Sequence, residues 1–269
     1  MNPRNFALPA PPLDELGFEL RERQLIRRLV RTAHGLVLVT GPRASGRTTT
    51  LRAMVAEIGP HRGRIRALET NDGPAFEDQV KGGDALVVDC VGGEPDAALT
   101  ARLFEAVAQG RFVLASLSGE RAHHAFVRLR ALARDREEIS SALTLVIGQA
   151  LATALCGRCA EPDASEQTRS ALAQASNSWL ESGELYPRTE SKGGCPYCNG
   201  TGVSGRALLY ECIEVDSAAR ALIEDGALGG TMEQALLSDG RSIWDQGLRL
   251  LARGAISLGA LREAAREPR

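Results

Sequence analysis

The sequence lacks a long hydrophobic run. Its longest apolar stretch, residues 142–156, is interrupted by polar residues and a glycine, and it is shorter than the ~20 residues that a membrane-spanning helix needs. The first six residues also lack the apolar core of a secretory signal peptide. We therefore expect a cytoplasmic protein, for which any role at a membrane comes through protein partners.

An excess of charge of either sign is also missing. The 32 Lys and Arg residues nearly balance the 34 Asp and Glu residues, which gives a formal net charge of −2. The chain as a whole therefore has no electrostatic attraction to nucleic acid or to an anionic membrane. Hydrophobic residues make up 43% and charged residues 25%, which is typical of a globular protein. A chain of 269 residues can form one large domain or two modest ones.

Cysteine is scarce, but four of the six cysteines form two Cys-x-x-Cys pairs. Cys156 and Cys159 make the first pair, and Cys195 and Cys198 make the second. Cysteines of cytoplasmic proteins are more often metal ligands than disulfides. Two such pairs can fold around a tetrahedral Zn²⁺ ion, and four thiolates leave no open position for a substrate. The sequence therefore predicts a structural zinc site, with four unbound thiols as the alternative.

Short apolar segments alternate with segments of helical periodicity in the first half of the chain. The expected strands are 35–40, 64–70, 84–89 and 112–117, and the expected helices are 19–32, 48–58, 95–109 and 121–134. Strands that alternate with helices indicate a mostly parallel sheet covered on both faces, which is an α/β fold. Residues 160–192 are polar and lack strong periodicity, and the chain from Asp216 onward has the pattern of helices.

A glycine-rich segment follows the first expected strand. It matches the phosphate-loop template G-x-x-x-x-G-K-[ST] except at position 47, where arginine replaces lysine. The glycines let the backbone approach phosphate closely, and Thr48 can offer its hydroxyl to Mg²⁺. The candidate nucleotide-binding residues are Gly41, Pro42, Arg43, Ala44, Ser45, Gly46, Arg47, Thr48 and Thr49. The alternative is a plain turn between a strand and a helix.

Arginine at position 47 changes what the loop can do. A lysine side chain brings a compact charge to the terminal phosphate oxygens, whereas arginine carries a broad planar fork of different reach. Arg47 can still attract phosphate. We expect the geometry needed for ATP hydrolysis to suffer more than nucleotide binding.

The segment that ends at Asp89 also departs from the pattern of a nucleotide hydrolase. The apolar strand expected before Asp89 ends in this aspartate, as in the strand that binds Mg²⁺ in nucleotide hydrolases. The alternative role for Asp89 is a strand-end cap. Cys90 stands where a catalytic glutamate would follow, and Glu94 comes four residues later. We expect Cys90 to be a small buried hydrophobic residue.

These motifs together resemble the C-terminal ATPase domain of the type II secretion and type IV pilus assembly motors. The segments that carry the resemblance are Leu13–Phe18, His34–Pro42, Thr48–Leu51, Leu155–Cys159, Gly194–Arg206, Tyr210–Asp216 and Gly247–Leu258. The resemblance covers residues 12–265, and the N-terminal domains that family members usually carry are missing from it.

The resemblance implies a RecA-like phosphate-loop core that uses ATP and Mg²⁺. It also implies a hexameric ring, homomeric or heteromeric, that acts with an inner-membrane platform protein on pilin-like subunits. No nucleic-acid partner is expected. The implied divisions are a tail (1–12), the RecA-like core (13–155), a tetracysteine zinc subdomain (156–215) and a helical C-terminal region (216–269).

Three residues carry the family's catalytic pattern only in part. Glu69 falls where the family has an acidic residue that positions the attacking water, and Glu94 is a second candidate. Ser118 stands where the resemblance places a histidine, and His123 and His124 nearby are expected on a helix face. Catalytic positions are thus altered while the scaffold motifs remain.

Three functions are compatible with this pattern. The first is a degenerate motor subunit that binds nucleotide with weak or absent hydrolysis, and it acts in or regulates a secretion or pilus assembly machine. The second is an active ATPase that relies on Glu69 or Glu94. The third is a zinc-ribbon nucleic-acid-binding module, although the cysteine knuckles lack the basic, aromatic-rich surface that such a module uses.

Overall fold

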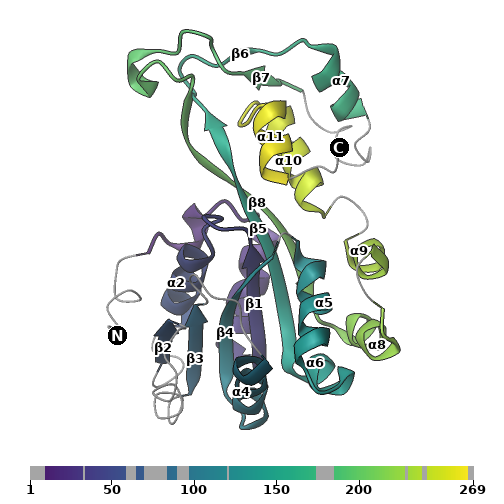
Figure 1. Cartoon of the computed structure of the whole chain (residues 1–269). Coiled ribbons are helices and arrows are strands. Elements are labelled where there is room, and N and C mark those ends of the chain that lie inside the picture. Colours follow the sequence, from purple (N-terminus) through teal and green to yellow (C-terminus); the bar gives the residue numbers. More distant parts are fainter. Residues whose placement is uncertain are drawn as a thin grey trace. The chain divides into compact units, whose positions relative to one another are not determined.

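The computed structural model describes most of the chain (Figure 1). The described residues are 10–32, 34–58, 65–69, 84–89, 97–119, 121–173, 185–227, 230–237 and 241–265. The chain divides into two compact units, one drawn from residues 1–149 and 212–236 and the other from residues 150–211 and 237–269. The four-part division expected from the sequence stays a prediction.

The first unit holds the segments in which strands and helices alternate. Its elements are η2 (Leu13–Glu15), α1 (Leu20–Thr32), β1 (Gly35–Gly41), α2 (Arg47–Ile58), β2 (Ile65–Glu69), β3 (Ala85–Asp89), α4 (Ala97–Ala108), β4 (Phe112–Ser118), α5 (Ala122–Leu132), α6 (Arg136–Ala142), α8 (Ser217–Asp225) and α9 (Gly230–Leu236). The strands and helices expected in this half are confirmed, with boundaries that differ by a few residues.

A six-stranded sheet of order β2-β3-β4-β1-β5-β8 forms the framework of this unit. Its last two members are β5 (Leu143–Leu155) and β8 (Val203–Glu214). Neighbouring strands from β2 to β5 run parallel. All seven residues of β1 are buried, as expected for a parallel strand with both faces covered. The expected α/β fold with a mostly parallel sheet is confirmed.

The two long strands β5 and β8 were not foreseen from the sequence. The apolar stretch 142–156 contains the whole of β5, whose first eight residues are buried except Thr144. A strand buried on both faces shows no alternation of polar and apolar residues, so periodicity does not reveal it. Each strand contributes to both units, since the unit boundary falls within it.

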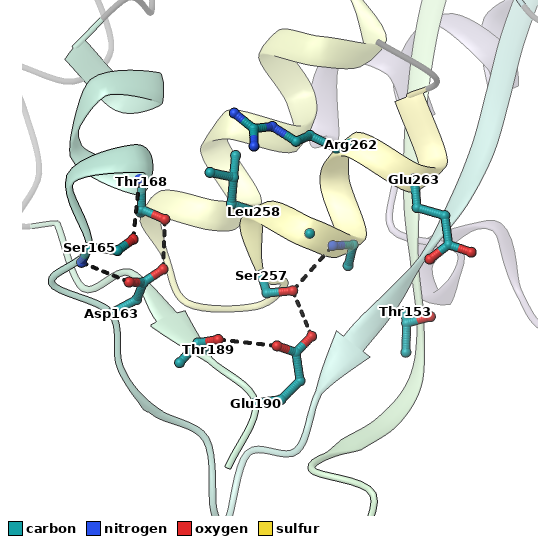
Figure 2. A pocket seen from close by; sticks show the side chains of 12 residues that line it. Thr153, Asp163, Ser165, Thr168, Thr189, Glu190, Ser257, Leu258, Arg262 and Glu263 are labelled. Carbon is teal, nitrogen blue, oxygen red and sulfur yellow. Dashed lines mark hydrogen bonds between the residues drawn. The ribbon is translucent and has the colours of Figure 1, made fainter. Parts of the chain in front are cut away.

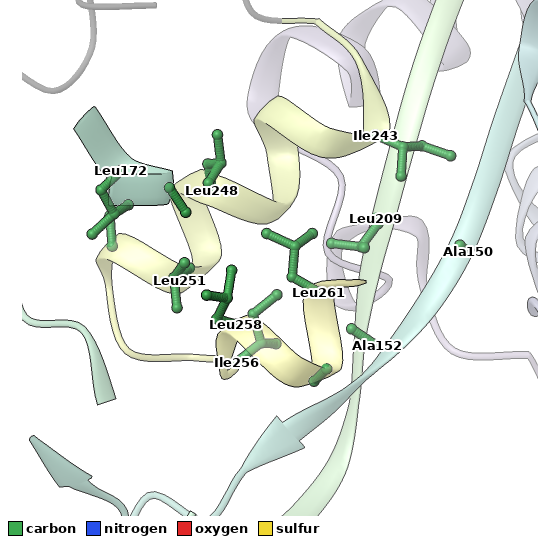
Figure 3. Close-up of a cluster of buried hydrophobic side chains, with 13 residues drawn as sticks. Ala150, Ala152, Leu172, Leu209, Ile243, Leu248, Leu251, Ile256, Leu258 and Leu261 are labelled. Carbon is green, nitrogen blue, oxygen red and sulfur yellow. The ribbon is translucent and has the colours of Figure 1, made fainter. Parts of the chain in front are cut away.

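The second unit has a hydrophobic core of its own. Its remaining elements are β6 (Glu161–Pro162), α7 (Glu166–Ala173), β7 (Arg188–Thr189), η4 (Pro196–Cys198), α10 (Ile243–Ala252) and α11 (Leu258–Ala265). Figure 3 shows this cluster, to which α10 contributes Leu248 and Leu251, α11 contributes Leu261 and β8 contributes Leu209. Leu251 is fully buried, and truncating such a leucine to alanine costs about 2–5 kcal/mol.

Helix α10 starts and packs for identifiable reasons. Ser242 and Asp245 form a capping box, in which each side chain accepts a hydrogen bond from the other residue's backbone N–H. Gly247 lies so close to α11 that a Cβ atom there would collide with the side chain of Leu261. The glycine therefore permits the close crossing of the two helices. In the part of the chain that the structure describes, no helix has the length and hydropathy to cross a membrane.

Candidate functional site

The glycine-rich segment forms a tight loop between β1 and α2. The loop starts at Gly41, where β1 ends, and α2 begins at Arg47. Ala44 and Gly46 both have left-handed backbone conformations, with φ of 62° and 87°. A non-glycine residue with positive φ is strained, and such strain is concentrated at functional sites. The first-turn N–H groups of α2, a helix of 12 residues, follow directly, which gives the loop the form of a phosphate-binding turn.

A buried glutamine supports this loop from β5. The Gln149 side chain donates a hydrogen bond to the Ser45 carbonyl oxygen at 2.7 Å and accepts one from Thr50 Oγ1 at 2.9 Å. A Cβ atom at Gly41 would collide with the Gln149 carbonyl oxygen and the Ser45 hydroxyl. Gln149 was not predicted as a site residue, and its only signal in the sequence is a polar residue inside an apolar stretch.

Asp89 lies at the carboxyl end of β3 and faces the loop. Its carboxylate accepts hydrogen bonds from Thr48 Oγ1 at 2.5 Å and from Ser116 Oγ at 2.5 Å, one on each oxygen. The Asp89 side chain is buried, with 1% relative exposure. The structure therefore brings together the two residues that the sequence assigned to Mg²⁺, Thr48 and Asp89. Ser116, which belongs to β4, was not foreseen.

Arg47 does not extend freely from the loop. Its Nη1 donates a hydrogen bond to Ser118 Oγ at 3.2 Å. Ser118 is the last residue of β4, and the strand register places it beside Gly41. Two of the positions at which the sequence departs from the expected pattern, 47 and 118, are therefore in direct contact.

The two glutamates proposed as catalytic are described only in part. Glu69 is the last residue of β2, and the register pairs it with Asp89 on β3. The backbone of Glu69 thus reaches the same edge of the sheet, while its side chain lies outside what the structure describes. Glu94 and Cys90 also lie outside the described residues. Both catalytic assignments stay predictions.

The two histidines of α5 differ in their surroundings. His123 is buried, whereas His124 is exposed. Burial lowers the pKa of His123 to about 4, with the nearby Glu233 carboxylate acting in the opposite direction and with His124 and Arg121 lowering it further. His123 Nδ1 lies 3.8 Å from the Glu233 carboxylate. A neutral, buried imidazole at this position is a packing residue of the helix.

The four paired cysteines converge on one point of the second unit. Their sulfur atoms all lie within 4.8 Å of one another. The Sγ–Sγ distances are 3.8 Å for Cys156–Cys195, 3.7 Å for Cys159–Cys198 and 3.8 Å for Cys195–Cys198. Four sulfurs bound at ~2.3 Å to a tetrahedral Zn²⁺ would lie about 3.8 Å apart. The donor set and its spacing therefore fit a tetrahedral metal ion.

The second cysteine knuckle also provides donors to sulfur. Burial raises the pKa of the Cys198 thiol, but the backbone N–H groups of Cys195 and Gly202 donate to its sulfur and lower the pKa to about 6 on balance. Thiolates, and not thiols, are metal ligands. The turn that brings these donors together needs glycine at position 194, where φ is 56° and a Cβ would collide with the backbone of Gly200.

A polar cavity of about 470 Å³ lies elsewhere in the second unit (Figure 2). Two carboxylates that line it accept hydrogen bonds from hydroxyl groups. Asp163 accepts one from Thr168 at 2.6 Å, and Glu190 accepts one from Ser257 at 2.6 Å and one from Thr189 at 3.1 Å. Burial raises the pKa of each carboxyl, yet the hydrogen bonds lower it on balance. The bond from Ser257 to Glu190 ties the segment after β7 to the start of α11, whereas the bond from Thr168 to Asp163 is local to α7.

The similarity of this chain to known proteins extends over nearly its whole length. The family model described as "Type II/IV secretion system protein" matches residues 1–73 and 89–266. The type II secretion system ATPase E of Vibrio cholerae is 30% identical over 273 residues, which cover 95% of this chain and 53% of that protein. The type II secretion system protein E of Aeromonas hydrophila is 29% identical over 279 residues, with the same coverage. The chain spans about half the length of these relatives.

Solved structures show the same fold. The pilus retraction motor PilT, solved with bound ADP, superposes with a TM-score of 0.67 at 19% identity and covers 97% of this chain and 68% of its own. The ATPase DotB of Legionella pneumophila superposes with a TM-score of 0.64 at 16% identity, over 94% of this chain and 65% of its own. The resemblance inferred from the loop and the cysteine knuckles is thus confirmed, and this chain belongs to the Type II/IV secretion system protein family.

Proposed function

We propose that this chain is the nucleotide-binding unit of a secretion or pilus assembly machine, and that it hydrolyses ATP weakly or not at all. The Gly41–Thr49 loop binds the phosphates of Mg–ATP. The replacement of lysine by arginine at position 47 carries the proposal, because a planar guanidinium that is bound through one nitrogen to Ser118 does not bring the compact charge of a lysine to the terminal phosphate.

The binding half of the proposal is supported by the intact parts of the site. A left-handed turn leads into the N-terminus of α2, and the positive end of a helix dipole favours phosphate. Thr48 and the buried Asp89 stand together at the carboxyl edge of the parallel sheet, where ligands of such sheets bind. The threonine hydroxyl of a phosphate loop and an aspartate at a strand end are the protein groups that hold Mg²⁺ in nucleotide hydrolases of this fold.

The proposal of weak hydrolysis is supported by the replacement of lysine by arginine at position 47. Phosphoryl transfer depends almost entirely on positioned charge around the transferred phosphate. Arg47 presents a planar fork in place of a point charge, and one of its nitrogens is bound to the end of β4. Loss of one such contact to a transition state slows a reaction by about 10²–10³-fold.

An active ATPase is the second candidate. The pairing of Glu69 with Asp89 at the same end of neighbouring strands favours it, since a glutamate beside the Mg²⁺ ligand can orient the attacking water. Arg47 would then serve as the phosphate cation, and Glu94 would be the alternative base.

Two measurements on purified protein separate these candidates. Equilibrium titration with a fluorescent ATP analogue and Mg²⁺ should show binding that Thr48→Ala weakens and the distant control Ser141→Ala preserves. Phosphate release should stay near background, and Arg47→Lys should raise it. Release by the unmodified protein at the ~10 s⁻¹ typical of enzymes would refute weak hydrolysis, and absence of binding would refute the nucleotide role.

The remaining features of the proposal concern assembly. We expect a structural Zn²⁺ at the four cysteines and a hexameric ring, homomeric or formed with an active relative. The ring would act on a platform protein at the cytoplasmic face of the inner membrane. Native mass spectrometry with and without Mg–ATP tests the ring, and a species that stays monomeric under both conditions would contradict it.

A further inference from the structure

Two arginines from different helices meet at one residue beside the phosphate loop. Arg47, at the start of α2, places Nη1 3.2 Å from the hydroxyl oxygen of Ser118. Arg128, in the middle of α5, places its own Nη1 3.2 Å from the carbonyl oxygen of the same serine. Arg128 lies outside the phosphate-loop motif and was not predicted as a site residue from the sequence.

The position of Ser118 is fixed relative to the loop. The parallel register of β1 and β4 sets Ser118 beside Gly41. The backbone N–H of Gly119 then donates to the carbonyl oxygen of Gly41 at 3.3 Å. A Cβ atom at Gly119 would lie too close to the Thr40 hydroxyl. The end of β4 and the first residue of the loop are therefore held together by backbone contacts.

A long side chain needs a second anchor to hold one position. Fixing the guanidinium of an arginine costs side-chain conformational entropy. Because the planar fork is preorganised, arginine loses less of this entropy per hydrogen bond than lysine does. The Ser118 hydroxyl supplies that anchor to Arg47. The position of this hydroxyl depends in turn on the Ser118 backbone, whose carbonyl oxygen accepts a hydrogen bond from Arg128. Contacts between residues in one hydrogen-bond network are energetically coupled.

We propose that Arg128 is a positioning residue of the nucleotide site, which acts through Ser118 to hold Arg47 against the polyphosphate of a bound nucleotide. The arginine at position 47 and the serine at position 118 then form one coupled replacement, and not two separate losses. The inference rests on the proposed nucleotide-binding function and adds a residue that serves it.

The competing explanation is that Arg128 only caps the end of β4. A cap would affect folding and would weaken nucleotide binding by the same factor whether or not the Ser118 hydroxyl is present. A residue that acts through that hydroxyl loses its effect when the hydroxyl is removed. A double-mutant cycle between positions 128 and 118 separates the two explanations.

The test measures the Kd of a fluorescent ATP analogue with Mg²⁺ for variants of this chain. Arg128→Gln should weaken binding about tenfold, the effect of losing one hydrogen bond in a coupled network. In the Ser118→Ala background the same change should alter Kd by less than about twofold. Arg128→Lys, which keeps a cationic donor, should recover most of the affinity, and Arg130→Gln on another face of α5 should match the unmodified protein.

The outcomes distinguish this inference from the proposed function. An equal effect of Arg128→Gln in both backgrounds, or no effect in either, would overturn the positioning role while nucleotide binding itself stands. If the unmodified protein bound no nucleotide, the proposed function would fail and the inference with it. Circular dichroism of each variant at the titration temperature confirms that the compared proteins are folded.

Discussion

The substitution His123→Gln should remove a defined part of the acid sensitivity of this protein. Burial lowers the pKa of His123 to about 4 in the folded state, whereas an exposed histidine titrates near 6.5. Above about pH 6.5 the imidazole is neutral in both states and contributes nothing. Between about pH 6.5 and pH 4 the unfolded chain binds a proton that the folded chain does not, so stability falls as the pH falls.

The size of this loss follows from the two pKa values. A difference of about 2.5 in pKa corresponds to about 3 kcal/mol at full effect. The pKa of about 4 already includes the opposing attraction of the Glu233 carboxylate, which lies 3.8 Å from His123 Nδ1. Between pH 7.5 and pH 4.5 we therefore expect a loss of about 2–3 kcal/mol. Urea unfolding followed by circular dichroism gives the free energy of unfolding at each pH.

The comparison between variants isolates this one group. Other acid-sensitive groups contribute equally to the unmodified protein and to His123→Gln, so the difference between the two curves reports His123. His124→Gln, a change at an exposed neighbour on the same helix, should keep most of the original pH dependence. Parallel curves for the unmodified protein and His123→Gln over this range would show that burial does not hold His123 neutral.

Three further predictions concern other contacts. Cys198→Ser should abolish the binding of one zinc per chain in elemental analysis, whereas Cys212→Ser, outside the cluster, should retain it; full zinc content in Cys198→Ser would contradict the site. Gln149→Leu should destabilise the protein by about 2–4 kcal/mol in urea unfolding, because two buried hydrogen bonds are lost, and a loss below about 0.5 kcal/mol would refute its supporting role. Glu190→Gln should lower the free energy of unfolding by about 1 kcal/mol at neutral pH. Hydrogen bonds lower the pKa of Glu190 against the effect of burial, so the difference between the two proteins should vanish at a pH below this pKa. A difference that persists in acid would contradict ionisation as its cause.

The sequence predicted those parts of the site that lie close together along the chain. The loop follows from two glycines and a threonine at fixed spacing, and each cysteine knuckle follows from a pair three residues apart. Such local motifs specify their own geometry because a few residues contain all the groups involved. The strands that end at the site were also recognisable as short apolar segments.

The residues that the sequence did not reveal reach the site through strand order. Ser116 lies on β4 and Gln149 on β5, and both strands are neighbours of β1 in the sheet. Arg128 approaches from α5. A hydrophobic pattern marks where a strand lies in the sequence, but not which strand it pairs with. The contacts of these side chains therefore became visible only in three dimensions.

The carboxylate at the end of β3 has a consequence for how an ion would arrive. Each carboxylate oxygen of Asp89 accepts a hydrogen bond from a hydroxyl of a different element. These two bonds restrict rotation of the carboxylate before any ion binds. A ligand that is oriented beforehand loses little entropy on association. Exchange of a cation at this edge would then be governed mainly by the shedding of its hydration water, with little reorganisation of the protein.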